Sequence, residues 1–108
     1  MLSEQLISIT TTFSTSAAAE ACGRRLVEMR LAGCVQVEGP LTSMYRWQGR
    51  LETATEWRCV CKTVADREMD CIAAIMALHD YEIPLIAVVA VRGSPAYAAW
   101  IRDSLVEP

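Results

Sequence analysis

The feature that most constrains this chain is the run of residues 33–63, whose pattern predicts a long β-hairpin. Two segments of strand character lie on either side of Gln48-Gly49, a dipeptide that suits a hairpin turn. The first segment is interrupted at Gly39-Pro40 and then carries Tyr45 and Trp47 on one face. A single small domain can hardly bury such large side chains, so the hairpin predicts assembly.

The remaining elements follow from periodicity and from the residues that start and end them. Strands are predicted over 6–12, 34–37 with a continuation at 41–47, 56–63 and 85–91. Helices are predicted over 17–32, closed by Gly33, over 67–78, capped by Asp66, and from Ser94-Pro95 onward. The inner faces of the second and third helices are expected at Ile72, Ile75 and Met76, and at Tyr97, Trp100, Ile101 and Leu105.

This order, βαββαβ with a C-terminal helix, is the split βαβ or ferredoxin-like arrangement. It predicts an α+β fold in which helices cover one face of an antiparallel sheet, in a single domain over residues 1–108. Residues 85–91 are almost wholly apolar, which predicts a central strand or one buried by a partner. The strands are also too apolar for the open sheet face to lie in water, so a partner chain is the expected cover.

Composition narrows the class of protein. The net charge of −3 argues against binding to a nucleic-acid backbone. No run approaches the roughly 18 apolar residues that a membrane span requires, and the N-terminus lacks the pattern of a signal peptide. The five cysteines show no C-x-x-C spacing, which favours free buried thiols in a reducing cytosol.

Several motifs together resemble the CutA divalent-cation-tolerance family. They are Ala-Gly-Cys-Val-Gln-Val at 32–37, Thr-Ser-Met-Tyr-Arg-Trp-Gln-Gly-Arg-Leu-Glu at 42–52, Lys62-Thr63, His-Asp-Tyr-Glu-Ile-Pro at 79–84 and Tyr-Ala-Ala-Trp at 97–100. The resemblance covers nearly the whole chain. It implies a cytoplasmic homotrimer in which the hairpin strands pair across subunits, and a link to copper and other divalent metals without a required cofactor.

The sequence departs from the family pattern at four positions. Asp80 stands where the family usually has proline, Leu85 where it has glutamate, and Gln36 where it has asparagine. Some members carry a cysteine implicated in copper binding at the end of the first strand, and Thr11 occupies the matching position here.

His79, Asp80 and Glu82 are the predicted metal ligands. His79 is the only histidine, imidazole binds Cu²⁺ or Zn²⁺, and the two carboxylates are hard donors in the same loop. The alternative is that His79 caps the preceding helix. Cys59 and Cys61 share a strand face with Trp57 and offer a second possibility, a thiolate site for Cu(I), against the alternative of an inward apolar face.

Tyr45, Trp47, Lys62 and Trp100 are the predicted residues of a trimer interface or intersubunit cleft. The aromatic pair could stack on a ligand ring or pack between subunits, and packing is favoured. Lys62 could pair with a glutamate or bind an anion.

Three functions remain open. The leading one is a non-catalytic trimer that binds or responds to divalent metal, since the chain has no nucleophile–base set and no Gly-rich phosphate loop. The second is a PII-like trimeric sensor that binds a small metabolite between subunits and signals to a protein partner. The third is an RRM-like nucleic-acid binder, which the acidic charge and the missing aromatic-basic pattern disfavour.

Overall fold

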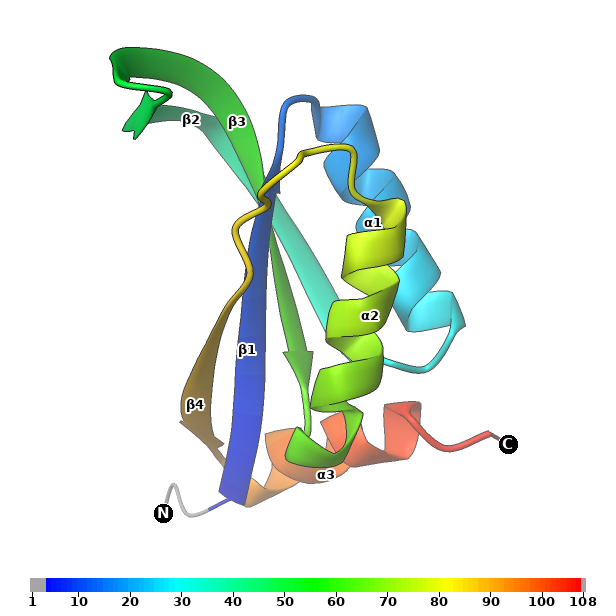
Figure 1. Ribbon diagram of the computed structural model, residues 1–108. Helices are drawn as coiled ribbons and strands as arrows, with labels where there is room; N and C mark the ends of the chain where they lie inside the picture. The colour runs from blue at the N-terminus through cyan, green and yellow to red at the C-terminus, as the bar shows by residue number, and fades with distance from the viewer. Residues whose placement is uncertain (1–3, 108) are drawn as a thin grey trace.

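A four-stranded antiparallel sheet with three helices forms the protein in the computed structural model, which describes residues 4–107 (Figure 1). The elements are β1 (Glu4–Phe13), α1 (Ser16–Glu28), β2 (Cys34–Trp47), β3 (Arg50–Thr63), the 3-10 turn η1 (Ala65–Arg67), α2 (Glu68–Leu78), β4 (Ala87–Gly93) and α3 (Pro95–Ser104). The strand order is β2-β3-β1-β4. The predicted α+β class and element order are confirmed.

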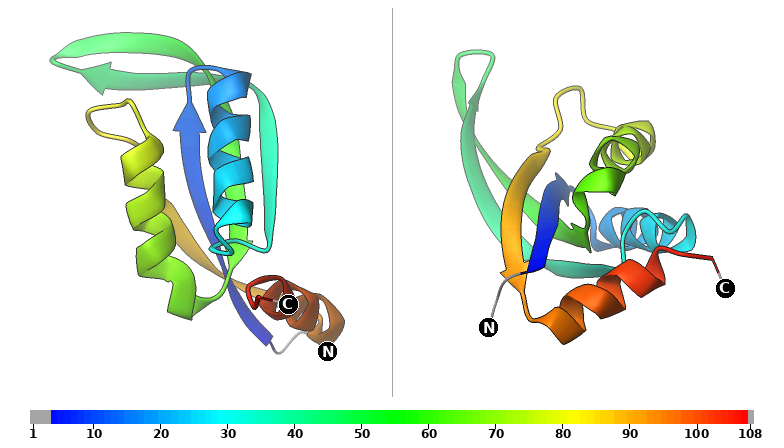
Figure 2. Two further views of the ribbon diagram at one scale, coloured as in Figure 1. Left: turned by 90° about the vertical axis from the view of Figure 1, so that its right-hand side faces the viewer. Right: turned by 90° about the horizontal axis from the view of Figure 1, so that it is seen from below.

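Helices α1 and α2 cover one face of the sheet, and α3 crosses the end where β1 begins (Figure 2). The main core lies between the sheet and the first two helices. Its buried members include Ile9 and Phe13 of β1, Leu26 of α1, Cys61 of β3 and Ile75 of α2. A smaller cluster, formed by Leu6, Ala98 and Ile101, packs α3 against β1.

The hairpin is longer than the alternation alone predicted, because β3 begins at Arg50. Gln48 (φ 51°) and Gly49 (φ 78°) both have positive φ, as a type I′ turn requires. The predicted interruption at Gly39-Pro40 is a register shift between Glu38 and Leu41. Beyond this shift the hairpin curves away from the body of the molecule (Figure 1).

The first helix ends earlier than predicted, at Glu28 rather than near Ala32. Arg30 takes the left-handed conformation (φ 57°), its N–H donates to the Val27 carbonyl, and the Leu31 N–H donates to the Leu26 carbonyl. These are the two hydrogen bonds of a Schellman motif, with arginine in the place where glycine is usual. Gly33 as the closing residue was therefore wrong; its N–H instead donates to the Lys62 carbonyl beside the sheet.

The second helix was predicted with the wrong start and a partly wrong inner face. Asp66 lies within η1, and α2 proper starts at Glu68. Cys71 and Ile75 face the core, whereas Met76 is exposed. The run from Cys71 to Leu78 is apolar throughout, so periodicity could not show which side faces inward.

The last strand and helix also differ from their predictions. β4 is an edge strand, so the predicted central position was wrong, and Val89 is 59% exposed. The alternative, burial by a partner chain, stays a prediction. In α3, Ala98 and Ile101 pack inward with Leu105 just beyond its end, while Tyr97 and Trp100 point to solvent. The N-cap at Ser94 is confirmed, since its hydroxyl oxygen accepts the Tyr97 N–H.

Gly23 provides a test of the helix–sheet packing. A Cβ placed there would lie 2.7 Å from Cγ1 of Val35, so α1 meets β2 only because residue 23 has no side chain. We expect Gly23→Ala to lower the free energy of unfolding by about 1–3 kcal/mol through overpacking, offset by at most about 1 kcal/mol of helix propensity. Urea unfolding measures the change.

Val35→Ala serves as the matched control for this contact. In the double variant the overpacking is relieved, so Gly23→Ala should cost less in the Val35→Ala background than in the wild type. Equal costs in both backgrounds would show that this contact does not determine the need for glycine.

Candidate functional site

His79 lies at the C-terminal end of α2, and its ring is buried against the end of β1. The side chain is 1% exposed and stacks on Phe13 with ring centroids 4.2 Å apart. Nε2 lies 2.8 Å from the Thr12 carbonyl oxygen, which can only accept, so Nε2 carries the proton and donates it. Nδ1 accepts the Tyr81 N–H at 3.2 Å. Both ring nitrogens are thus engaged, and neither has a lone pair free for a metal ion.

Tyr81 continues this network to β3. Its hydroxyl donates to Oε2 of Glu56 at 2.9 Å, and Glu56 is buried. Burial, followed by the hydrogen bond and the negative charge of Glu56, raises the pKa of Tyr81 to about 12. The loop after α2 is therefore held by His79 on β1 and by Tyr81 on β3.

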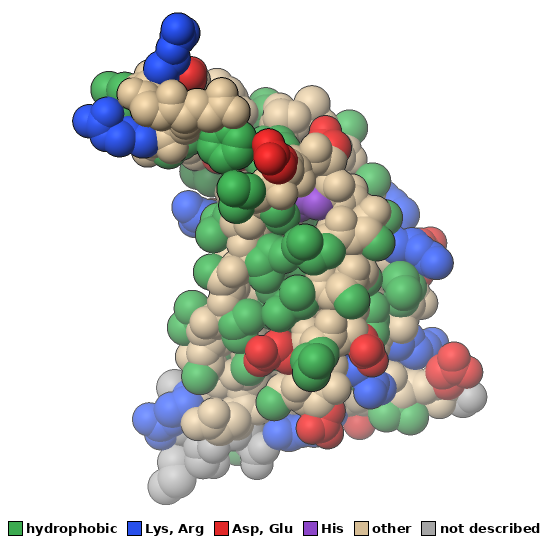
Figure 3. Space-filling model, viewed as in Figure 1, with side chains coloured by type: hydrophobic (Ala, Val, Ile, Leu, Met, Phe, Trp, Pro, Cys, Tyr) green, Lys and Arg blue, Asp and Glu red, His purple; other side chains and the backbone are tan. Residues whose placement is uncertain are grey.

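A hollow of about 550 Å³ lies between this loop and the projecting part of the hairpin. It is lined by Thr12, Tyr45, Arg46, Trp47, Glu56, Tyr81, Glu82, Ile83 and Leu85. Its wall thus combines aromatic rings with two carboxylates and one guanidinium. Figure 3 shows the single histidine as a small patch beside the base of the hairpin.

The structure brings some predicted site residues together and separates others. Tyr45, Trp47 and Glu82 line the hollow, whereas Asp80 is exposed beside His79 at 3.8 Å from Nδ1. Lys62 lies on β3 opposite Cys34 of β2, and Trp100 is 53% exposed on α3, stacked on Tyr97. Neither Lys62 nor Trp100 reaches the hollow within one chain.

Sequence reasoning missed Glu56 and Tyr81 as site residues. Glu56 begins an alternating strand and looked like an outward-facing acid. It is buried by a loop far along the chain, and no local pattern reports such a contact. Tyr81 lies inside the 79–84 motif, in which a histidine and two carboxylates are the residue types typical of a metal site.

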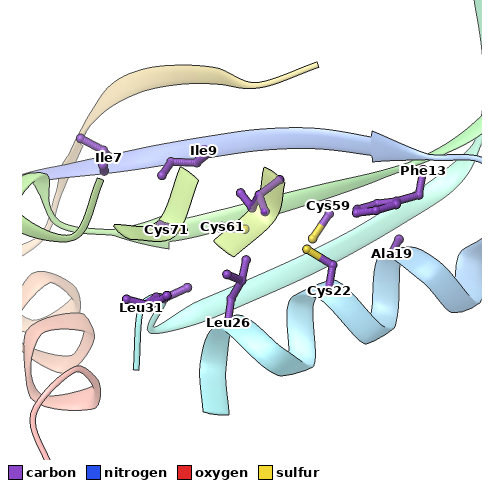
Figure 4. Close-up of a cluster of buried hydrophobic side chains, with 12 residues drawn as sticks. Ile7, Ile9, Phe13, Ala19, Cys22, Leu26, Leu31, Cys59, Cys61 and Cys71 are labelled. Atoms are coloured by element: carbon purple, nitrogen blue, oxygen red, sulfur yellow. The ribbon is translucent and has the colours of Figure 1, made fainter. Parts of the chain in front are cut away.

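Four buried cysteines lie between the sheet and helices α1 and α2, away from the hollow (Figure 4). Cys59 and Cys61 of β3 face the helices, where they share hydrogen bonds with Cys22 of α1 and Cys71 of α2. The hydrogen bond to Cys59, together with burial, raises the pKa of Cys22, and the same influences raise that of Cys61. Cys59 and Cys61 are both fully buried within the main core, which favours an inward apolar strand face over a Cu(I) site.

Neither predicted metal site is assembled within one chain. Among residues 4–107, no group of three or more histidine, cysteine or acidic side chains is placed to hold a metal ion. The carboxylates of Glu56 and Glu82 in the hollow are the donors that best suit a divalent cation.

The family model for the CutA1 divalent ion tolerance protein matches residues 7–104. The chain belongs to this family. It is 34% identical over 90 residues to the CutA homolog of Xenopus laevis. The match covers 82% of this chain but only 60% of the length of the Xenopus protein. It is 32% identical over 88 residues to the divalent-cation tolerance protein CutA of Archaeoglobus fulgidus, covering 81% of this chain and 85% of that protein.

Solved CutA structures share the fold. The crystal structure of CutA from Xylella fastidiosa superposes with a TM-score of 0.90 at 36% identity, covering 94% of this chain and 98% of that one. The Archaeoglobus fulgidus structure, described as periplasmic, superposes with a TM-score of 0.89 at 29% identity over 94% of this chain and 99% of that one. As for membranes, none of the helices within residues 4–107 has the length and apolar character to cross a bilayer.

The Tyr81–Glu56 pair predicts a pH dependence of stability. The pKa of Tyr81 is about 12 in the folded chain against 10.0 for a free phenol, so the folded state holds this proton more tightly. The stabilisation is fully present below pH 10 and is lost as the pH rises toward 12. We expect the Tyr81→Phe variant to lose less stability than the wild type between these pH values, measured by chemical denaturation.

Glu56→Gln is the companion variant. It keeps the shape of the acceptor but removes the negative charge, so the phenol should ionise at lower pH, as followed by phenolate absorbance. An alkaline stability profile that neither variant alters would contradict the pairing.

Proposed function

We propose that this protein binds divalent cations, copper among them, in a tolerance function that needs no catalysis, and that it works as a homotrimer. The observation that carries the proposal is membership of the CutA1 family over residues 7–104. The lack of catalysis is supported by His79, the only imidazole in the sequence, whose two nitrogens are occupied by structural hydrogen bonds. The metabolite-sensor alternative gains no support from the relatives above.

The hollow supports a cation site better than the histidine does. Glu56 and Glu82 line the same space, and carboxylate oxygens accept hard and borderline divalent ions. Two carboxylates make an incomplete set, so water or a second copy would supply the remaining ligands. Of the three predicted ligands, this proposal retains Glu82, which lines the hollow. Asp80 is exposed beside His79, and His79 holds the loop through its hydrogen bonds.

The trimer is supported by apolar surface that one chain leaves open. Val89 on the edge strand β4 and Met44 and Leu51 on the hairpin are all exposed. Edge strands with free hydrogen-bonding groups pair readily with another chain. In this arrangement Tyr45, Trp47, Lys62 and Trp100 are interface residues, and the hollow becomes an intersubunit cleft.

We also propose a cytoplasmic location, which the free thiols support. All five cysteines are free, and four of them are buried, as suits a reducing compartment. Because the archaeal relative is described as periplasmic, the location of this protein should be measured directly by cell fractionation.

The cation site can be tested by calorimetric titration with Cu²⁺. We expect Glu56→Gln and Glu82→Gln each to weaken binding by about tenfold, equivalent to about 1.4 kcal/mol, because each removes a charged donor. Asp103→Asn, an exposed carboxylate on α3 away from the hollow, should leave binding unchanged.

His79→Gln separates the two possible sites in the same titration. It should lower thermal stability through loss of its stacking and hydrogen bonds, yet leave Cu²⁺ binding intact at temperatures where the variant is folded. Loss of binding in His79→Gln with retention in Glu82→Gln would place the metal on the imidazole instead.

The assembly can be tested by light scattering coupled to size exclusion. The expected mass is about three times the 11.9 kDa of one chain. Trp47→Glu should shift the population toward smaller species because it buries a charge in an apolar interface. A wild-type protein that runs as a stable monomer at micromolar concentration would contradict the trimer.

A further inference from the structure

The outer face of α2 is an exposed apolar stripe that neither the fold nor the proposed trimer uses. Met69, Ala73, Met76 and Ala77 lie on this face, spaced by four, three and one residues, so they share one side of the helix. All four are exposed, with Met69 at 83% and Met76 at 52%. Figure 3 shows apolar side chains gathered over the region that α2 occupies in Figure 1.

Such a helix departs from the usual pattern of a surface helix. From Cys71 to Leu78 every side chain is apolar, so two turns have no polar residue on either side. A helix that is apolar all round is normally buried on all sides. Here Cys71 and Ile75 are covered by the core, and the opposite side is covered by no residue of the described chain 4–107.

The trimer surfaces do not account for this stripe. The hairpin, the edge strand β4 and the open face of the sheet lie on the far side of the sheet from α2 or at its edges (Figure 2). The surfaces assigned to the proposed trimer therefore leave the stripe uncovered.

Charge identifies the kind of partner. Asp66, Glu68 and Asp70 lie at the start of α2, and Asp80 and Glu82 follow its end. The one base in this stretch, Arg67, is turned away from the stripe, because it donates to the carbonyls of Arg30 and Leu105. The apolar stripe thus has carboxylates at both ends of a helix about 16 Å long.

We propose that the outer face of α2 is a docking site for a basic amphipathic helix of another protein. Its apolar side chains would pack over Ala73 and Ala77, whose small side chains allow another helix to come close, and against Met69 and Met76. Methionine side chains are flexible and adapt to apolar partners of different shape. Lysines or arginines at the two ends of the incoming helix would meet the carboxylates, and this complementarity fixes its position along the stripe.

The same charges disfavour two other occupants. An antiparallel pairing of α2 with α2 of a second copy would set the acidic start of one helix against the acidic end of the other. An anionic membrane surface would be repelled by the same carboxylates.

The test uses the full-length protein and a fluorescent peptide of about 18 residues, built from leucine and lysine at amphipathic helical spacing. A peptide of the same composition with scrambled order, and a leucine–glutamate peptide, serve as ligand controls in fluorescence anisotropy. We expect binding of the basic amphipathic peptide only. Met69→Gln/Met76→Gln should weaken it by about tenfold or more. Val27→Gln/Met29→Gln, which removes two exposed apolar side chains at the C-terminal end of α1, should not.

The double variant Asp70→Asn/Asp80→Asn tests the role of the carboxylates in binding the basic peptide. It should lower affinity and flatten its dependence on salt concentration, because fewer carboxylates face the peptide. Circular dichroism melting of each variant checks that the fold is retained, as expected for surface substitutions.

Three results would overturn the proposal. The first is equal binding of the scrambled peptide, and the second is unchanged binding in Met69→Gln/Met76→Gln. The third is a different occupant: oligomers beyond the trimer that the double methionine variant abolishes would assign the stripe to a second copy. Binding to phosphatidylglycerol vesicles, with no binding of the peptide, would assign it to a membrane.

Discussion

The pairing of β1 with β3 is the interaction on which the rest of the structure depends. Its register sets Ile9 opposite Cys61 and Phe13 opposite Trp57, which places the apolar members of both strands under α1 and α2. A shift of one residue would turn every one of these side chains to the other face of the sheet. The same register places the end of β1 beside Glu56, so the core and the candidate site depend on a single alignment.

From this alignment a closed circuit of contacts builds the site. The Thr12 carbonyl oxygen accepts a hydrogen bond from Nε2 of His79, and Nδ1 of His79 accepts one from the Tyr81 backbone N–H. The Tyr81 hydroxyl in turn donates to Glu56 on β3. The contacts thus lead from β1 through the loop after α2 to β3, which is itself paired with β1. The loop after α2 is therefore fastened to both β1 and β3, and the wall of the hollow that it forms is preorganised.

Much of this fold could be predicted from sequence, because local patterns determine it. The Gln48-Gly49 turn, the Ser94-Pro95 helix start and the alternation over residues 56–63 all specify structure within a few residues. The misplaced features depended on contacts that are distant in sequence. Arg30 ends α1 in a conformation that sequence assigns to glycine, and the orientation of the wholly apolar helix α2 is decided by what it packs against. The roles of His79 and Glu56 likewise depend on partners more than twenty residues away.

The turn at the hairpin tip has a consequence for how this molecule meets others. Both turn residues hold positive φ, so strand register is set from inside the hairpin rather than copied from a neighbouring surface. Formation of such a local structure takes microseconds, much faster than the collision of two chains at ordinary concentrations. Another copy would therefore encounter a hairpin whose two strands are already paired. Association then joins surfaces that are already folded, so little conformational entropy is lost in ordering them.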